Sequence, residues 1–356
     1  MTTPHAIPSQ SRHGLPVEHK QIYSFNTKDN QWLAADPSPS EEGMPLSTKF
    51  GIATWNIDFM RQHHELRYKT AFDYLQKTLT SADHDDHATT TIIFIQELEQ
   101  DFFPVITGHS FVRDCYNITD ISSETWCSSS SGYGTITLIP KSLSKYLAAV
   151  FRTPFPLSTM GRDALYIDLL LQHRPLNDNQ QKNGSQDEAG DQRRYLRLVN
   201  VHLESLRGQA DIERPMQLVS TVPFLDETNV YAGIVAGDMN PIGPYDAALP
   251  EQLGFTDAWV LNKRRRKEDE GASYMTDVDI EQDAESHTWG YQPMSRRYPP
   301  NRMDKVLMKG NVDVDSIDRI GVDVRVKWLG NKETPVWASD HYGLLATFRL
   351  RGDESS

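Results

Sequence analysis

Short apolar runs separated by polar stretches follow one another along the chain from about residue 48 to residue 350. The runs at 91–95 and 230–236 are continuous, which is typical of strands buried on both faces of a sheet. Apolar residues at helical spacing predict helices over residues 64–79 and 211–225. Mostly apolar segments predict further strands, at 49–55, 111–118, 133–139, 148–153, 164–171, 195–203, 303–308, 312–326 and 343–350.

The excess of strands over helices predicts an α/β fold in which two packed, mainly antiparallel β-sheets are flanked by helices. No proline- or glycine-rich linker divides residues 48–351, so we expect one domain there, followed by a short tail at 352–356. Residues 1–47 are polar and rich in proline and serine, which predicts a disordered N-terminal tail. Two polar stretches predict surface insertions, at about 174–194 and 261–287.

The formal net charge of −13 argues against a protein that coats nucleic acid without specificity. It leaves nucleic-acid chemistry open, because a carboxylate-rich metal site is itself acidic. One dense basic block, at 263–267, is typical of a phosphate contact or of a nuclear import signal. The acidic residues 268–270 follow at once, so a solvated loop is an equal interpretation.

No run of about 18 apolar residues occurs, and the N-terminal segment has no apolar core of a secretory signal. We therefore expect an intracellular protein that does not bind membranes, located in the nucleus, with the cytoplasm as a second location. In that setting Cys115 and Cys127 are expected to be reduced thiols.

Glu97 directly follows the buried run at 91–95 and is a candidate metal ligand. A buried carboxylate needs a partner, and Mg²⁺ prefers one or two carboxylates together with water and phosphate oxygens. An arginine partner or a helix cap is the alternative interpretation. Asn56, at the end of the first predicted strand, could orient a water or support the metal, or it could be an ordinary turn residue.

Asp238 and Asn240 follow the buried run at 230–236. In an extended conformation two such residues project on the same side of the strand. Together they could hold an attacking water, with Asp238 accepting its proton. Gly237 allows a tight turn there, which is also all that an ordinary turn would need.

His202 and His341 are candidates to donate hydrogen bonds to phosphoryl oxygens as charge develops. Asp304 could hold the far nitrogen of His341, which would set its tautomer and favour the charged ring. The chain has no GxSxG nucleophile elbow, no Walker lysine loop and no GxGxxG motif. The remaining chemistry is metal-assisted attack by water. The acidic, histidine-containing stretch 81–90 has ligand types too, but its place between a helix and a strand predicts a solvated loop.

Four short motifs, in this order, resemble those of the endonuclease/exonuclease/phosphatase (DNase I-like) superfamily over about residues 48–350. They are Thr54-Trp-Asn56, Gln96-Glu97, Gly237-Asp-Met-Asn240 and Ser339-Asp-His341. Within the superfamily, the segment His202-Leu-Glu-Ser-Leu-Arg-Gly208 and the pair Thr288-Trp289 resemble the tyrosyl-DNA phosphodiesterase 2 branch. The resemblance implies a four-layer α/β sandwich. It also implies an enzyme of DNA repair that hydrolyses the 5′-phosphotyrosyl bond between DNA and a trapped topoisomerase 2.

The same resemblance implies roles for single residues. Glu97 would hold Mg²⁺, for which Mn²⁺ could substitute, with Asp340 nearby. Water would be activated by Asp238 with the help of Asn56 and Asn240. The phosphate and the end nucleotide would be bound by residues on both sides of this centre, namely His202, Ser205, Arg207, His341 and Trp289. The partner implied is a DNA 5′ end that carries a tyrosyl or peptide adduct, bound by a monomer.

Two positions depart from the family's pattern. Ile242 stands where the family has an arginine. In the family the tryptophan at the position of Trp289 forms a hydrophobic wall for the end nucleotide together with an aromatic residue, and Met303 stands at the position of that aromatic residue. These departures leave open another phosphodiesterase of the same fold, such as an abasic-site endonuclease, an RNA nuclease or a small phosphate-ester hydrolase. A non-catalytic binding module is a third hypothesis, which the presence of all the core site residues disfavours.

Overall fold

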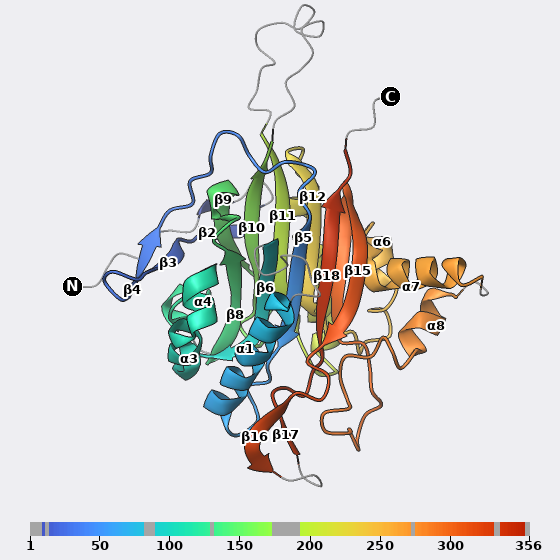
Figure 1. The fold of residues 1–356 in the computed structure, drawn as a ribbon. Coiled ribbons are helices and arrows are strands. Elements are labelled where there is room, and N and C mark those ends of the chain that lie inside the picture. The colour runs from blue at the N-terminus through green and yellow to red at the C-terminus, as the bar shows by residue number, and fades with distance from the viewer. Residues whose placement is uncertain are drawn as a thin grey trace, which may run out of the picture.

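Two eight-stranded β-sheets pack face to face, with helices on their outer sides (Figure 1). The structure, a computed structural model, describes residues 9–10, 14–81, 90–128, 132–172, 193–271, 275–330 and 335–352. The predicted fold of two packed, mainly antiparallel sheets flanked by helices is confirmed. Most of the predicted insertion at 174–194 and most of the stretch 81–90 lie outside the described residues, and Arg194 already belongs to a strand.

The first sheet runs, from edge to edge, β1 (Ser9–Gln10), β2 (Pro16–His19), β9 (Leu147–Pro154), β10 (Asp163–Leu171), β11 (Arg194–His202), β12 (Val230–Asp238), β14 (Asp304–Gly310) and β13 (Thr256–Asp257). The second runs β15 (Val312–Ile320), β18 (Gly343–Leu350), β5 (Phe50–Asn56), β6 (Thr91–Glu99), β8 (Tyr133–Pro140), β7 (Tyr116–Ile118), β3 (Ile22–Asn26) and β4 (Gln31–Ala35). A separate two-stranded ribbon consists of β16 (Arg325–Gly330) and β17 (Pro335–Trp337).

Each large sheet contains one parallel pair among antiparallel neighbours: β11 with β12, and β5 with β6. A parallel pair needs a crossover connection, and here each crossover contains a helix. Helix α1 (His64–Thr80) lies between β5 and β6 in the chain, and helix α5 (Ala210–Leu225) lies between β11 and β12. The carboxyl ends of all four strands carry polar residues, so this topology brings the candidate site together.

The remaining helices are short. They are α3 (Phe103–Gly108), α4 (Ser110–Cys115), α6 (Leu249–Gln252), α7 (Ala258–Asp269) and α8 (Asp277–Gln282), with single 3₁₀ turns at Gln100–Phe102, Ser123–Thr125 and Ser144–Tyr146. Among the described residues, every helix is too short or too polar to cross a lipid bilayer. Cys115 and Cys127 form no disulfide.

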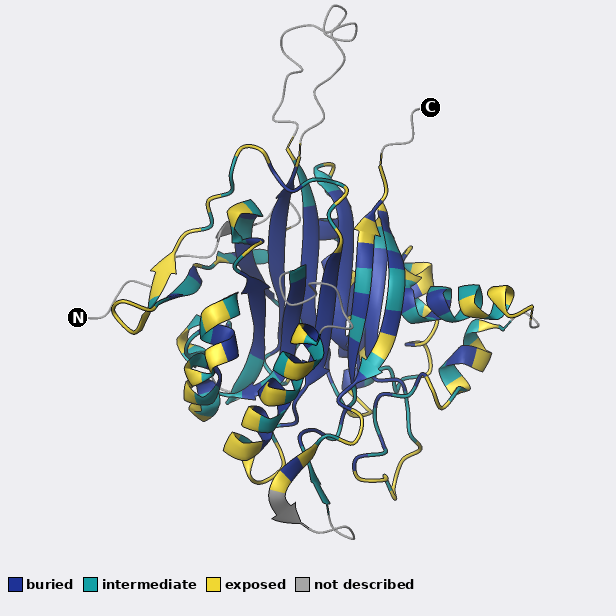
Figure 2. Cartoon of the chain, in the orientation of Figure 1, coloured by how far each residue is buried: buried dark blue, intermediate teal, exposed yellow. Residues whose placement is uncertain are grey.

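The main core lies between the two sheets, where the strands are buried almost throughout (Figure 2). Continuous apolar strands such as β10 and β12 are buried on both faces because a helix or the other sheet covers each side. Two outer cores complete the layers. One packs α1, α3 and α4 on the second sheet through residues such as Phe72 and Phe103, and the other packs α5 on the first sheet through Leu218 and Phe224.

The prediction that residues 1–47 form a disordered tail is wrong for the part that carries β2, β3 and β4. Strand β2 pairs with β9, and β3 pairs with β7, so this segment extends both sheets. The Phe25 and Trp32 rings pack at 5.4 Å, and the Trp32 indole donates a hydrogen bond to the Thr107 carbonyl at 3.1 Å. Its few apolar residues find partners far along the chain, which local composition does not reveal.

Two further local predictions need correction. Residues 110–115 are helical, and only 116–118 form a strand. The stretch 261–287 contains part of α7 and all of α8, and the basic block 263–267 lies within α7 rather than in a loop. Asp257 caps α7 by accepting hydrogen bonds from the Trp259 and Val260 amides, a signal that identifies a helix start.

Candidate active site

The carboxyl ends of the two parallel strand pairs meet between the sheets. Asn56 ends β5 and Glu97 lies near the end of β6, while His202 and Asp238 end β11 and β12 and are register partners. The Asn56 amide nitrogen donates to Glu97 Oε1 and to Asp238 Oδ2, at 3.0 Å each. Asn56 therefore joins a carboxylate of one sheet to a carboxylate of the other.

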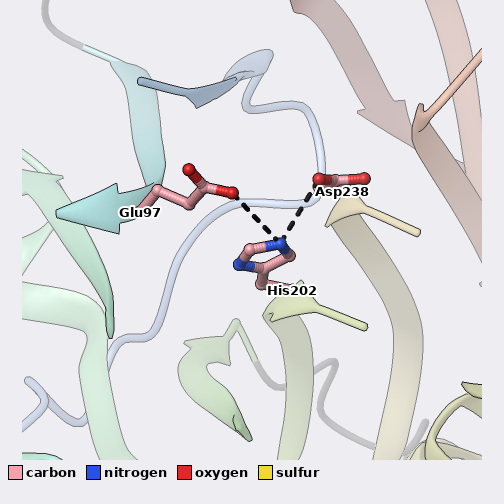
Figure 3. A group of neighbouring side chains, drawn as sticks. All are labelled: Glu97, His202 and Asp238. Atoms are coloured by element: carbon pink, nitrogen blue, oxygen red, sulfur yellow. Dashed lines mark ion pairs between the residues drawn. The ribbon is translucent and has the colours of Figure 1, made fainter. Parts of the chain in front are cut away.

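The His202 ring lies between the two carboxylates, and all three side chains point into one space (Figure 3). Its Nε2 is 3.3 Å from Asp238 Oδ2 and 3.6 Å from Glu97 Oε1. This nitrogen is buried and makes no well-aligned hydrogen bond. It is consequently available to a ligand that enters between the carboxylates.

The backbone is bent at both strand ends. Glu97 has a φ of +60° and lies where the pairing of β6 with β8 shifts register between Ile95 and Leu98. Such a bulge redirects a side chain at the end of a strand, and strained backbone of this kind often occurs at functional sites. Gly237 has a φ of +144°, and a Cβ there would lie 1.9 Å from the Val201 carbonyl oxygen, so only glycine fits.

Asn240 also has a left-handed backbone, with a φ of +45°. The expectation that Asp238 and Asn240 are successive outward positions of an extended strand is therefore wrong. The Asn240 backbone N–H instead donates a hydrogen bond to Asp238 Oδ1, with 3.0 Å between nitrogen and oxygen. The side-chain nitrogen of Asn240 donates to the Leu203 carbonyl at 3.0 Å. Asn240 thus holds the Asp238 carboxylate and the β11 end in place.

His341 reaches the same space from the loop before β18. Its Nδ1 lies 2.9 Å from Asp304 Oδ2, as the sequence predicts, and its Nε2 lies 4.0 Å from Asp238 Oδ2. Ser339 fixes this loop, because its hydroxyl donates to the Asn56 carbonyl at 2.6 Å and accepts from the His341 amide at 3.0 Å. The structure thus brings together the six residues proposed for the core of the site, which are Asn56, Glu97, His202, Asp238, Asn240 and His341.

Burial raises the pKa of Glu97 to about 7 against the lowering effect of the hydrogen bond from Asn56, and the charge of Asp340 adds to the rise. Burial also acts to raise the pKa of Asp238, but the His202 ring 3.3 Å away and the charge of His341 outweigh it, so that its pKa lies well below the ordinary value. Glu97 is thus the carboxylate that lacks compensating positive charge.

The two histidines differ in charge. Burial, with the nearby Arg162, lowers the pKa of His202 to about 4, so its ring is neutral at pH 7. Burial acts in the same direction on His341, but the Asp304 carboxylate outweighs it and holds the pKa of His341 well above 6.5. At neutral pH the site therefore contains one neutral and one cationic imidazole.

The residues predicted to bind substrate surround this centre less closely. The Trp289 indole nitrogen donates to Asp340 Oδ2 at 3.0 Å, which fixes the ring beside the centre. Ser205 donates to the Met160 sulfur at 3.4 Å. Arg207 is exposed, pairs with Asp211 at 3.2 Å and donates to the Ile242 carbonyl, while Met303 is buried.

Asp58 is a charged residue of this region that the sequence analysis does not include among the site residues. Burial and then the charge of Asp340 raise its pKa, against the opposing charge of Arg67 3.2 Å away. Its position two residues after Asn56, at the turn that follows a buried strand, is the only signal that sequence offered. Thr288 is a second such residue, since its hydroxyl accepts hydrogen bonds from the Met303 and Asp304 amides at 3.0 Å each.

The donor set fits a divalent cation. Ligand atoms of Glu97, His202 and Asp238 lie within 4.8 Å of one another, as do those of Asp238, Asp304 and His341. Glu97 accepts hydrogen bonds only from neutral groups, the Asn56 amide and the Phe59 backbone N–H, in the part of the chain described. A largely buried carboxylate with neutral donors alone, such as Glu97 with 14% of its side chain exposed, is stabilised by a hard cation, which prefers oxygen ligands.

Neither protein-family models nor curated protein sequences match this chain, whereas solved structures do. TDP2 of D. rerio, in complex with a single-strand DNA product, matches with 20% identity and a TM-score of 0.56, over 85% of this chain and 100% of that one. Truncated Caenorhabditis elegans TDP2 matches with 18% identity and a TM-score of 0.57, over 85% and 98%. An endonuclease/exonuclease/phosphatase protein from Bacteroides vulgatus matches with 14% identity and a TM-score of 0.51, over 85% and 100%.

At these identities the likeness concerns the fold alone. The resemblance that the four motifs indicate is therefore confirmed at the level of structure. The chain has the DNase I-like fold of the endonuclease/exonuclease/phosphatase proteins.

Proposed function

We propose that this protein is a Mg²⁺-dependent phosphodiesterase that hydrolyses 5′-phosphotyrosyl bonds at DNA ends. Its substrate would be DNA joined to a trapped topoisomerase 2, and its product a 5′-phosphate, which makes it an enzyme of DNA repair in the nucleus. The observation that carries the proposal is the convergence of Asn56, Glu97, His202, Asp238 and His341 on one space between the sheets. One of the similar structures, TDP2 of D. rerio in complex with a single-strand DNA product, supports the substrate class.

Asp238 is suited to orient the attacking water. Its low pKa keeps it ionised, and the hydrogen bonds from Asn56 and from the Asn240 amide fix the direction of its carboxylate. A fixed, ionised acceptor aligns one water O–H and stabilises the proton charge that leaves it in the transition state. Asn56 and Asn240 act here as positioning residues.

His341 and His202 are suited to bind the phosphoryl oxygens. The Nδ1 of His341 is held by Asp304, so the opposite nitrogen of the cationic ring is free to donate into the site. The Nε2 of neutral His202 faces the same space. Donors fixed in advance around developing negative charge each contribute roughly 10²- to 10³-fold in rate.

Glu97, with Asp340, would hold the divalent cation. When bound, that cation would act as a Lewis acid toward the phosphoryl group. Trp289, whose ring direction is set by Asp340, would stack on the terminal base without regard to its identity. Arg207, already directed toward the Ile242 backbone, lies where it could partly replace the arginine that the family has at that position.

A second candidate is another phosphodiesterase of the same fold. The buried position of Met303 favours it, because a buried methionine cannot supply the exposed second ring of a stacking wall. Abasic duplex DNA, poly(A) and an inositol phosphate represent the alternative substrates.

The test is release of tyrosine from a 5′-tyrosyl oligonucleotide, measured with Mg²⁺, with EDTA, and with Mg²⁺ restored. We expect cleavage that EDTA abolishes and Mg²⁺ restores. Asp238→Asn should lower kcat about 10³-fold, since it removes the fixed charge that aligns water. Asp73→Asn, on the exposed side of α1, is the matched control and should leave kcat unchanged. Turnover of an alternative substrate without tyrosine release would assign the site to the second candidate.

A further inference from the structure

Helix α5 exposes an apolar face to solvent. Ile212, Met216 and Val219 follow one another at spacings of four and three residues and are 60%, 46% and 36% exposed. The half-buried residues beside them are also apolar, namely Pro215, Val222 and Pro223. A surface helix ordinarily turns charged and polar residues outward, so this outer face is a candidate binding surface.

The polar residues of α5 face inward, where they fasten the loops around the site. Glu213 accepts a hydrogen bond from the Thr159 hydroxyl at 2.7 Å, and Gln217 bonds to the amide and the carboxylate of Glu204. Arg214 pairs with Asp246 at 2.6 Å. These contacts explain the inner face of the helix and leave its apolar outer face without a structural purpose.

The apolar surface continues toward the candidate active site. Leu206, which follows Ser205, is 66% exposed, and Leu157 is 63% exposed on a turn that Thr159 ties to the first turns of α5. We define the α5 apolar face by its five most exposed members, Leu157, Leu206, Ile212, Met216 and Val219. It begins beside Ser205 and runs away from the centre along α5.

The face and Trp289 lie on opposite sides of the centre. In the first sheet the order is β11, β12, β14, so His202 and the following Ser205 lie on one side of Asp238 and Asp304 on the other. Trp289 is bridged to Asn301, just before β14, and to His341. A phosphodiester held between them has two ester arms. If one arm carries the nucleotide over Trp289, the other points toward Ser205 and the α5 apolar face.

We infer that the α5 apolar face binds apolar side chains of the peptide that is attached to the scissile phosphate through its tyrosine. This inference rests on the proposed function and extends it. The enzyme would prefer adducts that retain a short apolar peptide over adducts trimmed to tyrosine alone. The face would act on substrate affinity and not on the chemical step.

Size and charge favour this occupant over others. A 16-residue helix is about 24 Å long and about 10 Å wide, so its outer face is on the order of 200 Å². A stable dimer needs about 800 Å² from each partner. Nucleic acid and anionic lipid need cations, and Arg207, which follows Leu206 in the chain, is paired with Asp211. A tethered peptide needs little intrinsic affinity, because the tether holds it at roughly millimolar effective concentration.

The test compares three substrates with the same oligonucleotide: one with 5′-tyrosine alone, one with tyrosine in a short leucine- and valine-rich peptide, and one with tyrosine in a serine- and glycine-rich peptide. The triple variant Ile212→Gln, Met216→Gln, Val219→Gln removes the three members of the face that lie on α5 and keeps helix-forming residues there. We expect the full-length protein to show a KM roughly tenfold lower for the apolar peptide substrate than for the other two. The triple variant should lose that advantage with kcat unchanged.

Val278→Gln, at an exposed apolar position of α8 that lies outside the face, is the control and should behave as the parent protein. Circular dichroism and the thermal midpoint would show that the variants are folded. Equal KM values for all three substrates, or a triple variant that keeps the preference, would overturn the inference while leaving the proposed function standing. A parent dimer in sedimentation that the triple variant abolishes would also overturn it. Absence of tyrosine release from every substrate would instead overturn the proposed function, and this inference with it.

Discussion

Strand β11 carries two buried ionisable side chains, Arg197 and His202, each of which lies beside carboxylates. At one position Arg197 makes a two-pronged pair with Asp168, with 2.7 Å between Nε and Oδ1 and 2.7 Å between Nη2 and Oδ2. At its end His202 lies between Glu97 and Asp238, and no cation pairs with Glu97 in the described structure. Arg197 faces helix α5 and His202 faces the second sheet, yet both side chains are buried, so burial alone does not distinguish them.

The difference lies in how the charge is compensated. The guanidinium fork satisfies both oxygens of Asp168, and Arg197 also donates to the Phe224 carbonyl of α5 at 2.6 Å. Glu97 receives only neutral donors, which do not offset the effect of burial, so its pKa is raised to about 7. A compensated buried charge indicates a structural role, while an uncompensated carboxylate beside orphaned polar atoms indicates a place for a ligand.

The largest effect on the free energy of unfolding is expected from breaking the Arg197–Asp168 pair. Arg197→Met leaves Asp168 buried without its partner and should lower the free energy of unfolding by about 3–5 kcal/mol. Urea denaturation measures this loss. The double variant Arg197→Met, Asp168→Leu is the control, and it should recover most of the stability because no buried unpaired charge remains. Glu227, which also pairs with Arg197 at 2.8 Å, is partly exposed and stays solvated. A single variant as stable as the parent would show that the pair is not structural.

A smaller effect should come from supplying the missing charge. Mg²⁺ at a hundred times its Kd should raise the free energy of unfolding by about 2.7 kcal/mol, because it binds the folded state alone. The measurement is urea denaturation in Mg²⁺ and in EDTA. Glu97→Gln should abolish the response, whereas Asp73→Asn should keep it. An equal response in Glu97→Gln would remove Glu97 from the metal site.

Neutralising the Glu97 carboxylate should raise the free energy of unfolding, whereas breaking the Arg197–Asp168 pair should lower it. In EDTA at pH 8, Glu97→Gln should raise the free energy of unfolding by about 2 kcal/mol. The pKa rise from 4.5 to about 7 corresponds to about 3 kcal/mol. Partial loss of the hydrogen bonds to Asn56 and Phe59 offsets about 1 kcal/mol of it. The same variant should be inactive in the tyrosine-release assay.

This stabilisation should depend on pH. Between pH 4.5 and about 7 the folded protein retains a proton on Glu97 that the unfolded chain has lost, so the free energy of unfolding falls as pH rises. Below pH 4.5 both states are protonated, so only the hydrogen-bond loss remains and Glu97→Gln should be about 1 kcal/mol less stable than the parent. Above pH 7 the difference between the two proteins should be constant. A difference independent of pH would mean that the carboxylate charge is not its cause.

The sequence predicted the strands well where they are continuous and apolar. Runs such as 91–95 and 230–236 have few alternatives to a buried strand, and the helices that follow β5 and β11 show helical periodicity. It failed where a segment has few apolar residues of its own. Strands β2, β3 and β4 form because strands from other parts of the chain pair with them. Helix α7 is stabilised by its N-terminal cap and by ion pairs, and it has no apolar residues at regular helical spacing that would predict it.

The residue types of the site and their positions after buried strands were determined by the sequence alone, as was the pairing of His341 with Asp304. Only the tertiary structure decided how they combine. It bent the backbone at Glu97 and Asn240, placed His202 between two carboxylates, and made one histidine neutral and the other cationic. It also turned the polar residues of α5 inward and left an apolar face outside. The physical reason is that the charge state and the direction of each site side chain depend on its neighbours in space. These neighbours come from four strands that are far apart in the sequence, and the local pattern of residues carries no information about them.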